Sequence, residues 1–438
     1  MLFSNVSVLN PDFSISDGMY VEINGSTISY LANRPPDGCK VAVKSNKLLM
    51  PAFYNAHTHS PMTLLRGYGE NLKLSDWLEK KVFPFEDKMN GDDCYYSTLL
   101  AMAGSFAHGV VSSSDNYFFC EDIVRAVSES GAKMNVSRGL SYFQDTLDAS
   151  TFKPLQESRN LYLEHHDTCD GRIRVDIALH AEYTATPALI EAVSLLSHEA
   201  KAPVHVHVSE TKSEHDECKV RNGGLTPTEV FDKAGIWDYG GLAAHCVWVE
   251  EHDADIFVKK GVTAVSCSVS NMKLAGGIAR IPLLLDKGVN VALGTDGTCS
   301  NNNLNFFEEI KLLALGAKVR FGDPTLISSE QALYAATKAG AIAQGRNDCG
   351  FIEIGAKADF IIIDLNSPSL NPVYDISDSL VYAASSRDID MTVCDGKIVY
   401  KREHGGFDEY PTLDLERVIY EVSKSKDRIL SELGEGTR

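Results

Sequence analysis

The chain has 438 residues, 44% of them hydrophobic, and this length and composition predict one large domain with a smaller one beside it. The formal net charge of −19 argues against nucleic acid and membrane surfaces as partners, and no apolar run reaches the roughly 18 residues that a membrane span needs. The ten cysteines form no CxxC pair and residues 1–6 do not begin a signal peptide, so we expect reduced thiols in a cytoplasmic protein.

Short segments of alternating apolar and polar residues occur near both ends of the chain. They cover much of residues 2–47 and return toward the C-terminus, where Asp395-Gly396 is typical of a hairpin turn. This alternation predicts antiparallel strands with one buried face. We therefore expect a small β-sandwich domain assembled from residues 1–50 and 350–405.

Between these ends, in residues 51–349, a strand followed by a helix recurs eight times. Most of the strands are apolar on both faces, as in a parallel sheet that is covered by helices. The pattern predicts an α/β fold, a (β/α)8 TIM-like barrel whose active site lies at the carboxyl ends of the strands. We expect a C-terminal helix, within residues 406–438, to pack outside the barrel. The expected barrel strands are residues 49–55, 110–116, 133–140, 174–181, 203–209, 241–247, 262–268 and 289–295.

Side chains that can bind a metal stand at the ends of several of these strands. His57 and His59 are two residues apart and therefore share one face of a strand, while His207 and Asp296 end later strands. Three imidazoles and one carboxylate suit a single divalent metal, best Zn²⁺, with Fe²⁺ or Mn²⁺ as alternatives. Such an ion makes a water acidic enough to serve as hydroxide at neutral pH. The competing interpretation is a set of satisfied core histidines with a helix-capping aspartate.

Two further groups near these residues are suited to proton transfer. Glu210 follows His207 by three residues and could carry protons between water and substrate, or it could be a first-turn glutamate that the helix dipole favours. His245 ends another strand, where it could polarise or deprotonate water or pack as a core histidine. His205 shares a strand face with His207 and could also reach the metal, but it lies one step deeper, and we expect it to support a metal ligand or to pack. Trp77 could cover an aromatic substrate or simply pack.

A set of short motifs runs through nearly the whole chain. They are Ala56-His-Thr-His59, Met62-Thr-Leu-Leu-Arg-Gly67, Asp76-Trp-Leu78, Phe83-Pro-Phe-Glu86, Arg138-Gly139, His180-Ala-Glu-Tyr-Thr184, His205-Val-His-Val-Ser-Glu-Thr211, Ala244-His-Cys246, Ser270-Asn-Met-Lys-Leu274, Gly294-Thr-Asp-Gly297, Ser300-Asn-Asn302 and Gly355-Ala-Lys-Ala-Asp359. Together they resemble the nucleoside-deaminase branch of the amidohydrolase superfamily. Within that branch the chain is most similar to the S-adenosylhomocysteine/5′-methylthioadenosine deaminases.

The resemblance implies a zinc-dependent aminohydrolase that removes the 6-amino group of an adenosine-type nucleoside. Glu210 would protonate the purine ring nitrogen, and His245 would orient the hydroxide. Glu86 and His180 would contact the ribose hydroxyls, and Arg138 would contact the distal part of the nucleoside. The metal would be held by the three histidines and the aspartate named above.

Three positions bear on the metal count and on the substrate. Strand four ends at His180 without the lysine that bridges two metals in binuclear barrel hydrolases, so we expect one metal. Residues 142–151, after strand three, lack the arginine that in the family often holds the carboxylate of S-adenosylhomocysteine. Residues 266–270 lack the histidine and proline that often follow strand seven. We therefore expect 5′-methylthioadenosine, S-adenosylhomocysteine, 5′-deoxyadenosine and adenosine to be comparable candidates.

Three functions are compared. The first is nucleoside deamination, in which Glu210 and Asp296 manage the protons. The second is a related amidohydrolase that acts on guanine, cytosine or an s-triazine, and the third is a barrel that binds a ligand without turning it over. The ribose pair, Glu86 and His180, favours the first. The expected partner is a small-molecule nucleoside, and a homo-oligomer is left open.

Overall fold

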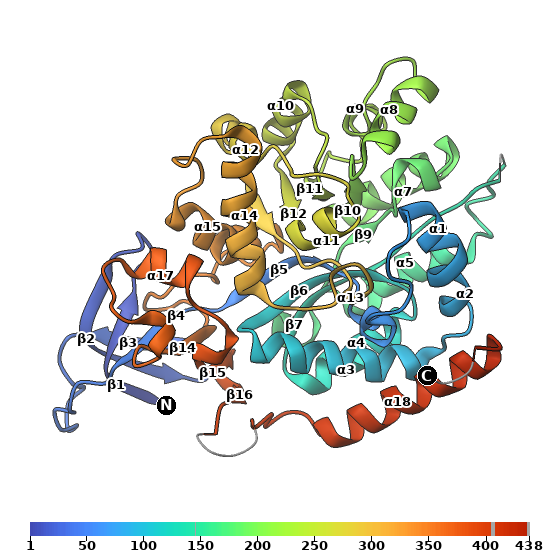
Figure 1. Cartoon of the computed structure of the whole chain (residues 1–438). Coiled ribbons are helices and arrows are strands. Elements are labelled where there is room, and N and C mark those ends of the chain that lie inside the picture. The colour runs from blue at the N-terminus through green and yellow to red at the C-terminus, as the bar shows by residue number, and fades with distance from the viewer. Residues whose placement is uncertain (145, 404–407, 436–438) are drawn as a thin grey trace.

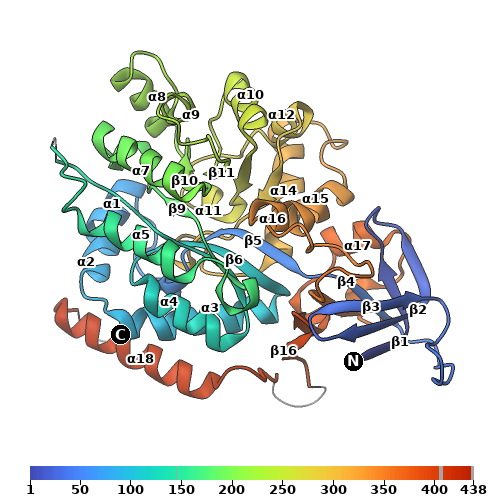
Figure 2. The same ribbon diagram turned by 180° about the vertical axis from the view of Figure 1, so that it is seen from behind.

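The strands of the computed structural model form three sheets in the part of the chain that it describes, residues 1–144, 146–403 and 408–435 (Figure 1). Two sheets, of four and five parallel strands, make up the main body, and helices cover them (Figure 2). The third sheet has seven strands and lies beside this body. The fold is therefore α/β and TIM-barrel-like, as the strand–helix rhythm predicts.

The seven-stranded sheet combines strands from both ends of the chain. Its central strand β4 runs parallel to β1 and antiparallel to β14, so residues more than 300 positions apart are paired, such as Met50 with Ile361. In spatial order the strands are β16 (Lys397–Lys401), β15 (Ile389–Cys394), β14 (Phe360–Asp364), β4 (Lys47–Pro51), β1 (Leu2–Leu9), β2 (Ile15–Asn24) and β3 (Thr27–Ala32).

The strand expected at residues 49–55 is divided between two sheets. The segment Lys47–Pro51 belongs to the seven-stranded sheet, and the barrel strand β5 begins at Phe53. Pro51 has no N–H to donate, so the first ladder ends there. The next two amides pair elsewhere: Ala52 donates to Asp359 and Phe53 donates to Gly109. The prediction of one continuous strand was therefore wrong at this position.

The parallel strands account for all eight barrel segments expected from the sequence. The four-stranded sheet contains β5 (Phe53–Thr58), β6 (Val110–Tyr117), β7 (Lys133–Arg138) and β8 (Ile173–Val175), and the five-stranded sheet contains β9 (Ile177–Ala178), β10 (Val204–Val208), β11 (Gly241–His245), β12 (Val262–Ser266) and β13 (Val291–Leu293). Strand four is divided at Asp176, whose N–H donates to Val136. On the other side of the body, the N–H of Asp296 donates to the carbonyl of His57 at 3.0 Å.

Helices follow most of these strands, and many of them pack against the two parallel sheets, while α17 and α18 pack on other helices. They are α1 (Leu74–Trp77), α2 (Phe83–Glu86), α3 (Gly91–Ala107), α4 (Cys120–Ser130), α5 (Lys153–His165), α6 (Thr168–Gly171), α7 (Pro187–Ala200), α8 (Lys212–Arg221), α9 (Pro227–Lys233), α10 (Glu251–Lys260), α11 (Ser268–Lys273), α12 (Ile281–Lys287), α13 (Thr298–Asn301), α14 (Phe306–Phe321), α15 (Ser329–Ala336), α16 (Lys338–Ala343), α17 (Ile376–Tyr382) and α18 (Leu415–Glu432). Short 3₁₀ or π turns cover Ser60–Leu65, Leu78–Val82, Glu182–Thr184, Pro368–Leu370 and Ser386–Asp388. No helix in the described ranges is both long and apolar enough to cross a membrane.

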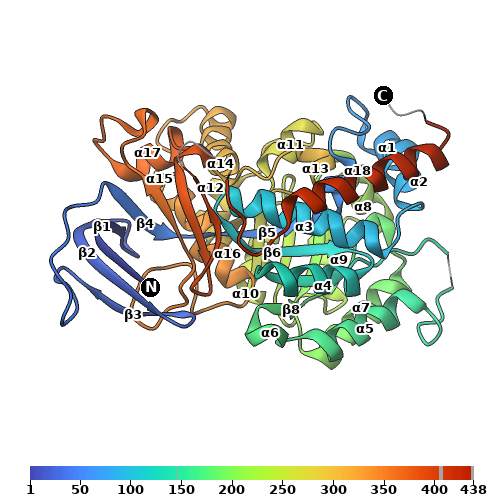
Figure 3. The ribbon, with the colours of Figure 1, turned by 90° about the horizontal axis from the view of Figure 1, so that it is seen from below.

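The helix α18 lies across α3 on the outside of the main body (Figure 3). A capping box opens α3: the side chain of Asn90 accepts from the amide of Asp93, and the Asp93 carboxylate accepts from the amide of Asn90. The same carboxylate forms an ion pair with Arg428 of α18. The C-terminal helix is thus joined by a charged contact to α3, the helix that precedes β6.

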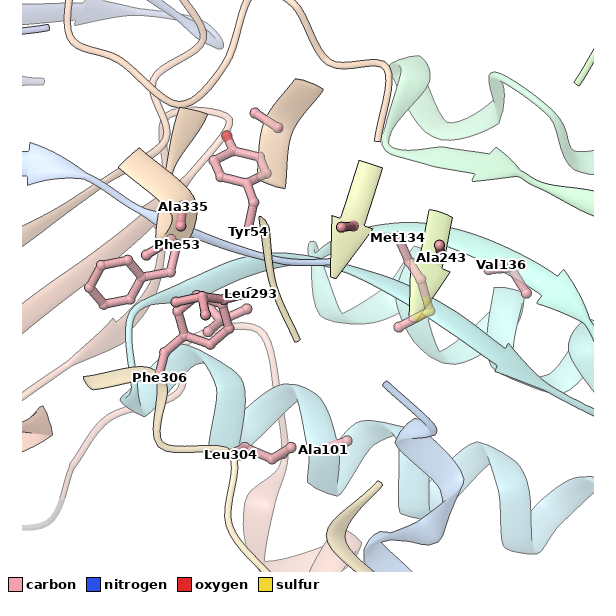
Figure 4. Packing of buried hydrophobic residues seen from close by; sticks show 14 of the residues in the cluster. Phe53, Tyr54, Ala101, Met134, Val136, Ala243, Leu293, Leu304, Phe306 and Ala335 are labelled. Atoms are coloured by element: carbon pink, nitrogen blue, oxygen red, sulfur yellow. The ribbon is translucent and has the colours of Figure 1, made fainter. Parts of the chain in front are cut away.

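A continuous apolar core fixes the barrel strands relative to one another. Phe53 of β5 stacks on Phe306 of α14 at 5.4 Å and meets Phe307 edge-on at 5.2 Å between ring centroids. Figure 4 shows side chains from β5, β7, β11 and β13 in the same core. Because these strands are parallel and buried, their carboxyl ends are held at one end of the body.

A buried ion-pair network joins the opposite end of the body to the seven-stranded sheet. Lys133, the first residue of β7, donates to both carboxylate oxygens of Asp359 and to Asp395 at 2.7 Å. Tyr54 donates to Asp359 as well. Burial alone would lower the pKa of Lys133, but the two carboxylates outweigh it and raise that pKa above its ordinary value. All three N–H groups of the lysine therefore have carboxylate partners in the interior.

Candidate active site

Four imidazoles and one carboxylate converge where the parallel strands end. His57 lies in β5, with His59 just beyond it, and His207 and His245 lie in β10 and β11. The carboxylate of Asp296, after β13, has one oxygen 3.3 Å from His59 Nε2 and 3.6 Å from His57 Nε2. His59 Nε2 and His207 Nε2 are 3.3 Å apart. The structure therefore brings together the four residues that the sequence singles out as metal ligands.

Each of the three histidines expected to bind metal is held through its Nδ1 atom. His57 Nδ1 lies 2.7 Å from His205 Nε2, His59 Nδ1 lies 2.5 Å from a main-chain carbonyl at the end of β6, and His207 Nδ1 lies 2.6 Å from the carbonyl of His180. A carbonyl oxygen can only accept, so for His59 and His207 Nδ1 carries the proton and Nε2 presents a lone pair. Imidazoles held in this way are suited to metal binding.

The hydrogen-bond partners and charges of these side chains fit a divalent cation. His57 Nε2 is fully buried and has no hydrogen-bond partner in the structure, although it faces the Asp296 carboxylate. Burial lowers the pKa of His57 to about 4 and the pKa of His207 well below its ordinary value, so both rings are neutral at neutral pH. Neutral imidazoles beside an ionised aspartate fit Zn²⁺ as ligands.

The Asp296 carboxylate is oriented by short contacts from three directions. Ser270 and Ser300 donate their hydroxyls to one oxygen at 2.6 and 2.8 Å, and the amide of Gly297 donates to the other at 2.7 Å. Asp296 itself has a φ of 60°, in the left-handed region that non-glycine residues rarely adopt. Burial alone would raise its pKa, but His57 and His59 hold that pKa well below its usual range. Sequence reasoning quoted both serines in motifs but did not assign them this role.

Glu210 and His245 face one another beside the histidine cluster. Glu210 Oε2 is 3.9 Å from His245 Nε2, and His245 Nδ1 lies 2.8 Å from Asn271 Oδ1. Burial raises the pKa of Glu210 above its ordinary value. Burial alone would lower the pKa of His245, but the charges of Glu210 and Asp296 raise it. A carboxyl group that keeps its proton more readily than usual can serve as a general acid.

A second carboxylate, Glu214, supports the backbone at Glu210. It accepts the amide N–H groups of Ser209 and Glu210 at 2.9 and 2.8 Å. Burial and the neighbouring Glu210 charge raise the pKa of Glu214 to about 7. Sequence reasoning did not single out this residue, although Thr211 and Glu214 form the capping box of α8, a pattern that can be recognised from sequence.

Glu86 and Arg138 line one cavity of about 950 Å³, and none of the four expected metal ligands is among its lining residues in the described chain. Tyr117 donates to Glu86 at 2.5 Å, and the Tyr117 ring lies 6.3 Å from the ring of His59. Burial raises the pKa of Glu86 to about 7. The ring of His180 lies 4.8 Å from that of His207, so this histidine is on the metal side of the site.

Trp77 lies in a different place from Glu86 and Arg138. It is 7% exposed and lines a cavity of about 70 Å³ together with Glu70, Lys273 and Cys299. It is not among the residues that line the larger cavity within the described chain. These contacts support packing, the alternative role considered for this tryptophan.

Parallel strands covered by helices, with a histidine and carboxylate cluster at the strand ends, define the class of metal-dependent barrel hydrolases. The sequence model of the amidohydrolase family matches residues 48–399 of the chain. The chain therefore belongs to the amidohydrolase family. The match covers the barrel strands and every residue of the candidate site.

Named relatives match most of the chain. It is 37% identical over 435 residues to the 5-methylthioadenosine/S-adenosylhomocysteine deaminase of Caldanaerobacter subterraneus subsp. tengcongensis, covering 98% of each chain. It is 38% identical over 367 residues to the 5′-deoxyadenosine deaminase of Methanothermobacter thermautotrophicus, covering 84% of this chain and 85% of the relative. An adenosine deaminase structure from Xanthomonas campestris with bound zinc superposes with a TM-score of 0.89 at 28% identity, covering 98% of each chain.

Proposed function

We propose that this amidohydrolase removes the 6-amino group of adenosine-type nucleosides and releases ammonia and the corresponding inosine. The observation that carries the proposal is the convergence of His57, His59, His207 and Asp296 beside the Glu210–His245 pair. The names of the relatives support the substrate class, since they are deaminases of 5′-methylthioadenosine, S-adenosylhomocysteine and 5′-deoxyadenosine. The related structure with bound zinc supports Zn²⁺ as the metal.

We assign the metal to His57, His59, His207 and Asp296. A divalent cation bound there supplies Lewis-acid activation of a water. The partnerless His57 Nε2 supports the assignment, because a buried nitrogen without a partner carries a cost that a cation would remove. A single ion is favoured because the chain after β9 reaches His180 without a lysine that could bridge two ions.

The protons are assigned to groups of this chain. One proton of the attacking water passes through Glu210 to the purine nitrogen N1, and His245 orients the water through its contact with Glu210. The second proton passes through Asp296 and Glu210 to the 6-amino group. The C6–N bond then breaks, ammonia leaves, and the oxygen taken from water becomes the C6 carbonyl. Both protons of the water are thereby accounted for.

The sugar is assigned to the cavity that Glu86 and Arg138 line. Glu86 accepts the vicinal ribose hydroxyls, Arg138 faces the 5′ end, and His180 approaches the ribose hydroxyls from the metal side, where its ring lies 4.8 Å from that of His207. A free base leaves the buried Glu86 carboxylate without these donors, which penalises binding. This argument separates the proposal from its alternative, an amidohydrolase of guanine, cytosine or an s-triazine.

The test is a comparison of kcat/KM for adenosine, 5′-deoxyadenosine and 5′-methylthioadenosine against adenine, guanine and cytosine, followed as ammonia release by the zinc-loaded protein. We expect the nucleosides to exceed the free bases by at least about a hundredfold, roughly 2.7 kcal/mol of lost ribose contacts. A preference for a free base would replace the proposal by its alternative, and zinc-loaded protein without activity on either group would favour a binding protein.

Three further inferences concern the closure of the barrel, the seven-stranded sheet and the cellular compartment. We infer that the eight strand units close into one barrel, supported by the hydrogen bond from Asp296 to His57. We also infer that the seven-stranded sheet folds over its own apolar core as a small sandwich, supported by a separate cluster that includes Val6, Val21 and Phe360. Domain limits of 1–50 with 350–405, 51–349 and 406–438 follow from this division. All ten cysteines are free, which supports a cytoplasmic setting.

A further inference from the structure

The cavity lined by Glu86 and Arg138 has more acidic than basic side chains. Its lining has two cationic side chains, Arg138 and Lys153. It has six carboxylates, which are Glu86, Asp87, Glu121, Asp122, Glu157 and Glu164. A carboxylate on an incoming ligand would meet mainly like charges, whereas an ammonium group would meet opposite ones.

Both cations are engaged by one residue, Glu157 of α5. Arg138 Nε donates to Glu157 Oε2 at 3.0 Å, and Arg138 also donates through Nη1 to the carbonyl of Gly139. Lys153 Nζ lies 3.5 Å from the other oxygen of Glu157. The Arg138 side chain is 18% exposed while that of Lys153 is 84% exposed, so Arg138 is the sheltered cation of the cavity. Its charge is compensated before any ligand arrives.

The Arg138–Glu157 pair lines the cavity to which the proposed function assigns the sugar of the substrate. Glu86, the residue assigned to the ribose, lines the same cavity as Arg138 and Glu157. Tyr117 donates to Glu86, and the Tyr117 ring lies 6.3 Å from the ring of His59, so these contacts connect Glu86 with the metal ligands. A nucleoside whose base reaches the metal and whose ribose reaches Glu86 would extend its 5′ substituent toward Arg138 and Glu157.

We propose that Glu157 determines the charge of the 5′ substituent that the enzyme accepts: by occupying Arg138 it excludes a carboxylate and favours neutral or cationic groups. The proposal rests on the function proposed above and adds to it a substrate class, adenosines with an uncharged or ammonium-bearing 5′ chain. A carboxylate that approached Arg138 would either displace Glu157, which would stay in the cavity as a negative charge, or pair with Arg138 Nη2 and still meet the charge of Glu157 beside it. An ammonium group needs no such exchange.

The experiment uses three 5′-thioether adenosines with chains of equal length that end in a methyl, an ammonium or a carboxylate group. For the wild-type holoenzyme we expect kcat/KM for the carboxylate substrate to be at least about tenfold below that for the methyl substrate, the size of one charge-assisted contact. The ammonium substrate should equal or exceed the methyl one. Deamination of all three with a preference for the carboxylate would overturn the proposal and leave the deaminase function standing.

A variant then tests the residue itself. Glu157→Gln removes the negative charge beside Arg138 while keeping the size of the side chain, and the carboxylate-to-methyl ratio of kcat/KM should rise about tenfold. Glu199→Gln is the matched control, because Glu199 pairs with Arg159 at 2.7 Å on the surface and is not among the residues that line the cavity. That control should leave the ratio at the wild-type value.

The double variant Glu157→Gln with Arg138→Met completes the design. It removes the freed cation, so the gain on the carboxylate substrate should disappear. An unchanged ratio in Glu157→Gln, or a gain that survives the loss of Arg138, would overturn the role of Glu157. Loss of deamination of all three substrates by the zinc-loaded wild-type protein would instead count against the proposed function.

Discussion

The two ends of the barrel strands both bury polar side chains, but they satisfy them differently. At the amino end, Lys133 gives all three of its N–H groups to Asp359 and Asp395. At the carboxyl end, His57 Nε2 is buried without a partner among like imidazoles, and Asp296 and His245 have φ values of 60° and 73°. At the amino end, side chains of opposite charge contact one another and connect two sheets. At the carboxyl end, lone pairs converge beside residues with a left-handed backbone, an arrangement that is typical of a ligand-binding site.

The difference gives a criterion for separating structural from functional polar clusters. A buried cluster whose donors and acceptors match, like that at Lys133, needs nothing from outside. A cluster with several neutral acceptors and one carboxylate, like that at His57, becomes satisfied when a cation binds.

The largest effect is expected at the metal ligands. His57→Ala and Asp296→Ala should each remove bound zinc and abolish turnover, because each deletes one of four converging donors. Zinc content by elemental analysis and ammonia release measure the two effects. His198→Ala is the control, since His198 is a surface histidine that pairs with Asp238. Either ligand variant with full activity and full zinc content would refute the assignment.

The next effect separates proton transfer from metal binding. Glu210→Gln should keep zinc and lose kcat by about 10²–10⁴, the usual contribution of a general acid–base group. Glutamine fills the same space but cannot deliver a proton to the purine ring. An unchanged kcat would show that Glu210 takes no part in proton transfer. Zinc content measured in the same preparation shows whether the loss arises at the metal.

At the amino end, loss of one partner should affect stability and spare the metal. Lys133→Met leaves Asp359 and Asp395 buried without their cation, and we expect a loss of about 3–5 kcal/mol in the free energy of unfolding. Urea denaturation measures it. Lys212→Met is the matched control, because it breaks an exposed pair with Asp216 that is worth at most about 1 kcal/mol. Equal stability of the two variants would remove the contrast between the two ends.

The smallest effect concerns pH. Burial raises the pKa of Glu86 to about 7, so this carboxyl is ionised above that pH and protonated below it. The ionised form accepts two ribose hydroxyls, and kcat/KM for adenosine should therefore rise about tenfold between pH 6 and pH 8 through this group. The comparison is the pH profile of Glu86→Gln, which cannot titrate. Identical slopes in both proteins would assign the pH dependence to another residue.

The sequence predicts those parts of the molecule that depend on local spacing. Alternating strands and helices indicated the TIM-barrel-like body, and the His57–His59 spacing indicated a shared strand face. The break between β4 and β5 was missed because both segments are apolar, and only the different partners of Ala52 and Phe53 separate them.

Contacts between distant segments could not be predicted in this way. Ser270 reaches Asp296 across 26 positions of sequence, and Glu157 reaches Arg138 across 19. No local pattern fixes such distances, because they depend on how the loops pack above the strands. The lack of an arginine in residues 142–151 was visible in the sequence, but the carboxylate that engages Arg138 comes from α5.

The central position of β4 has a consequence for biosynthesis. Its residues Leu48–Met50 leave the ribosome long before β14, the neighbour with which they form an antiparallel ladder. During translation one edge of this apolar strand stays open while about 300 further residues are made, and open apolar edges promote association between chains. The nascent chain is therefore expected to require protection from a chaperone until Phe360–Asp364 emerges and completes the sheet.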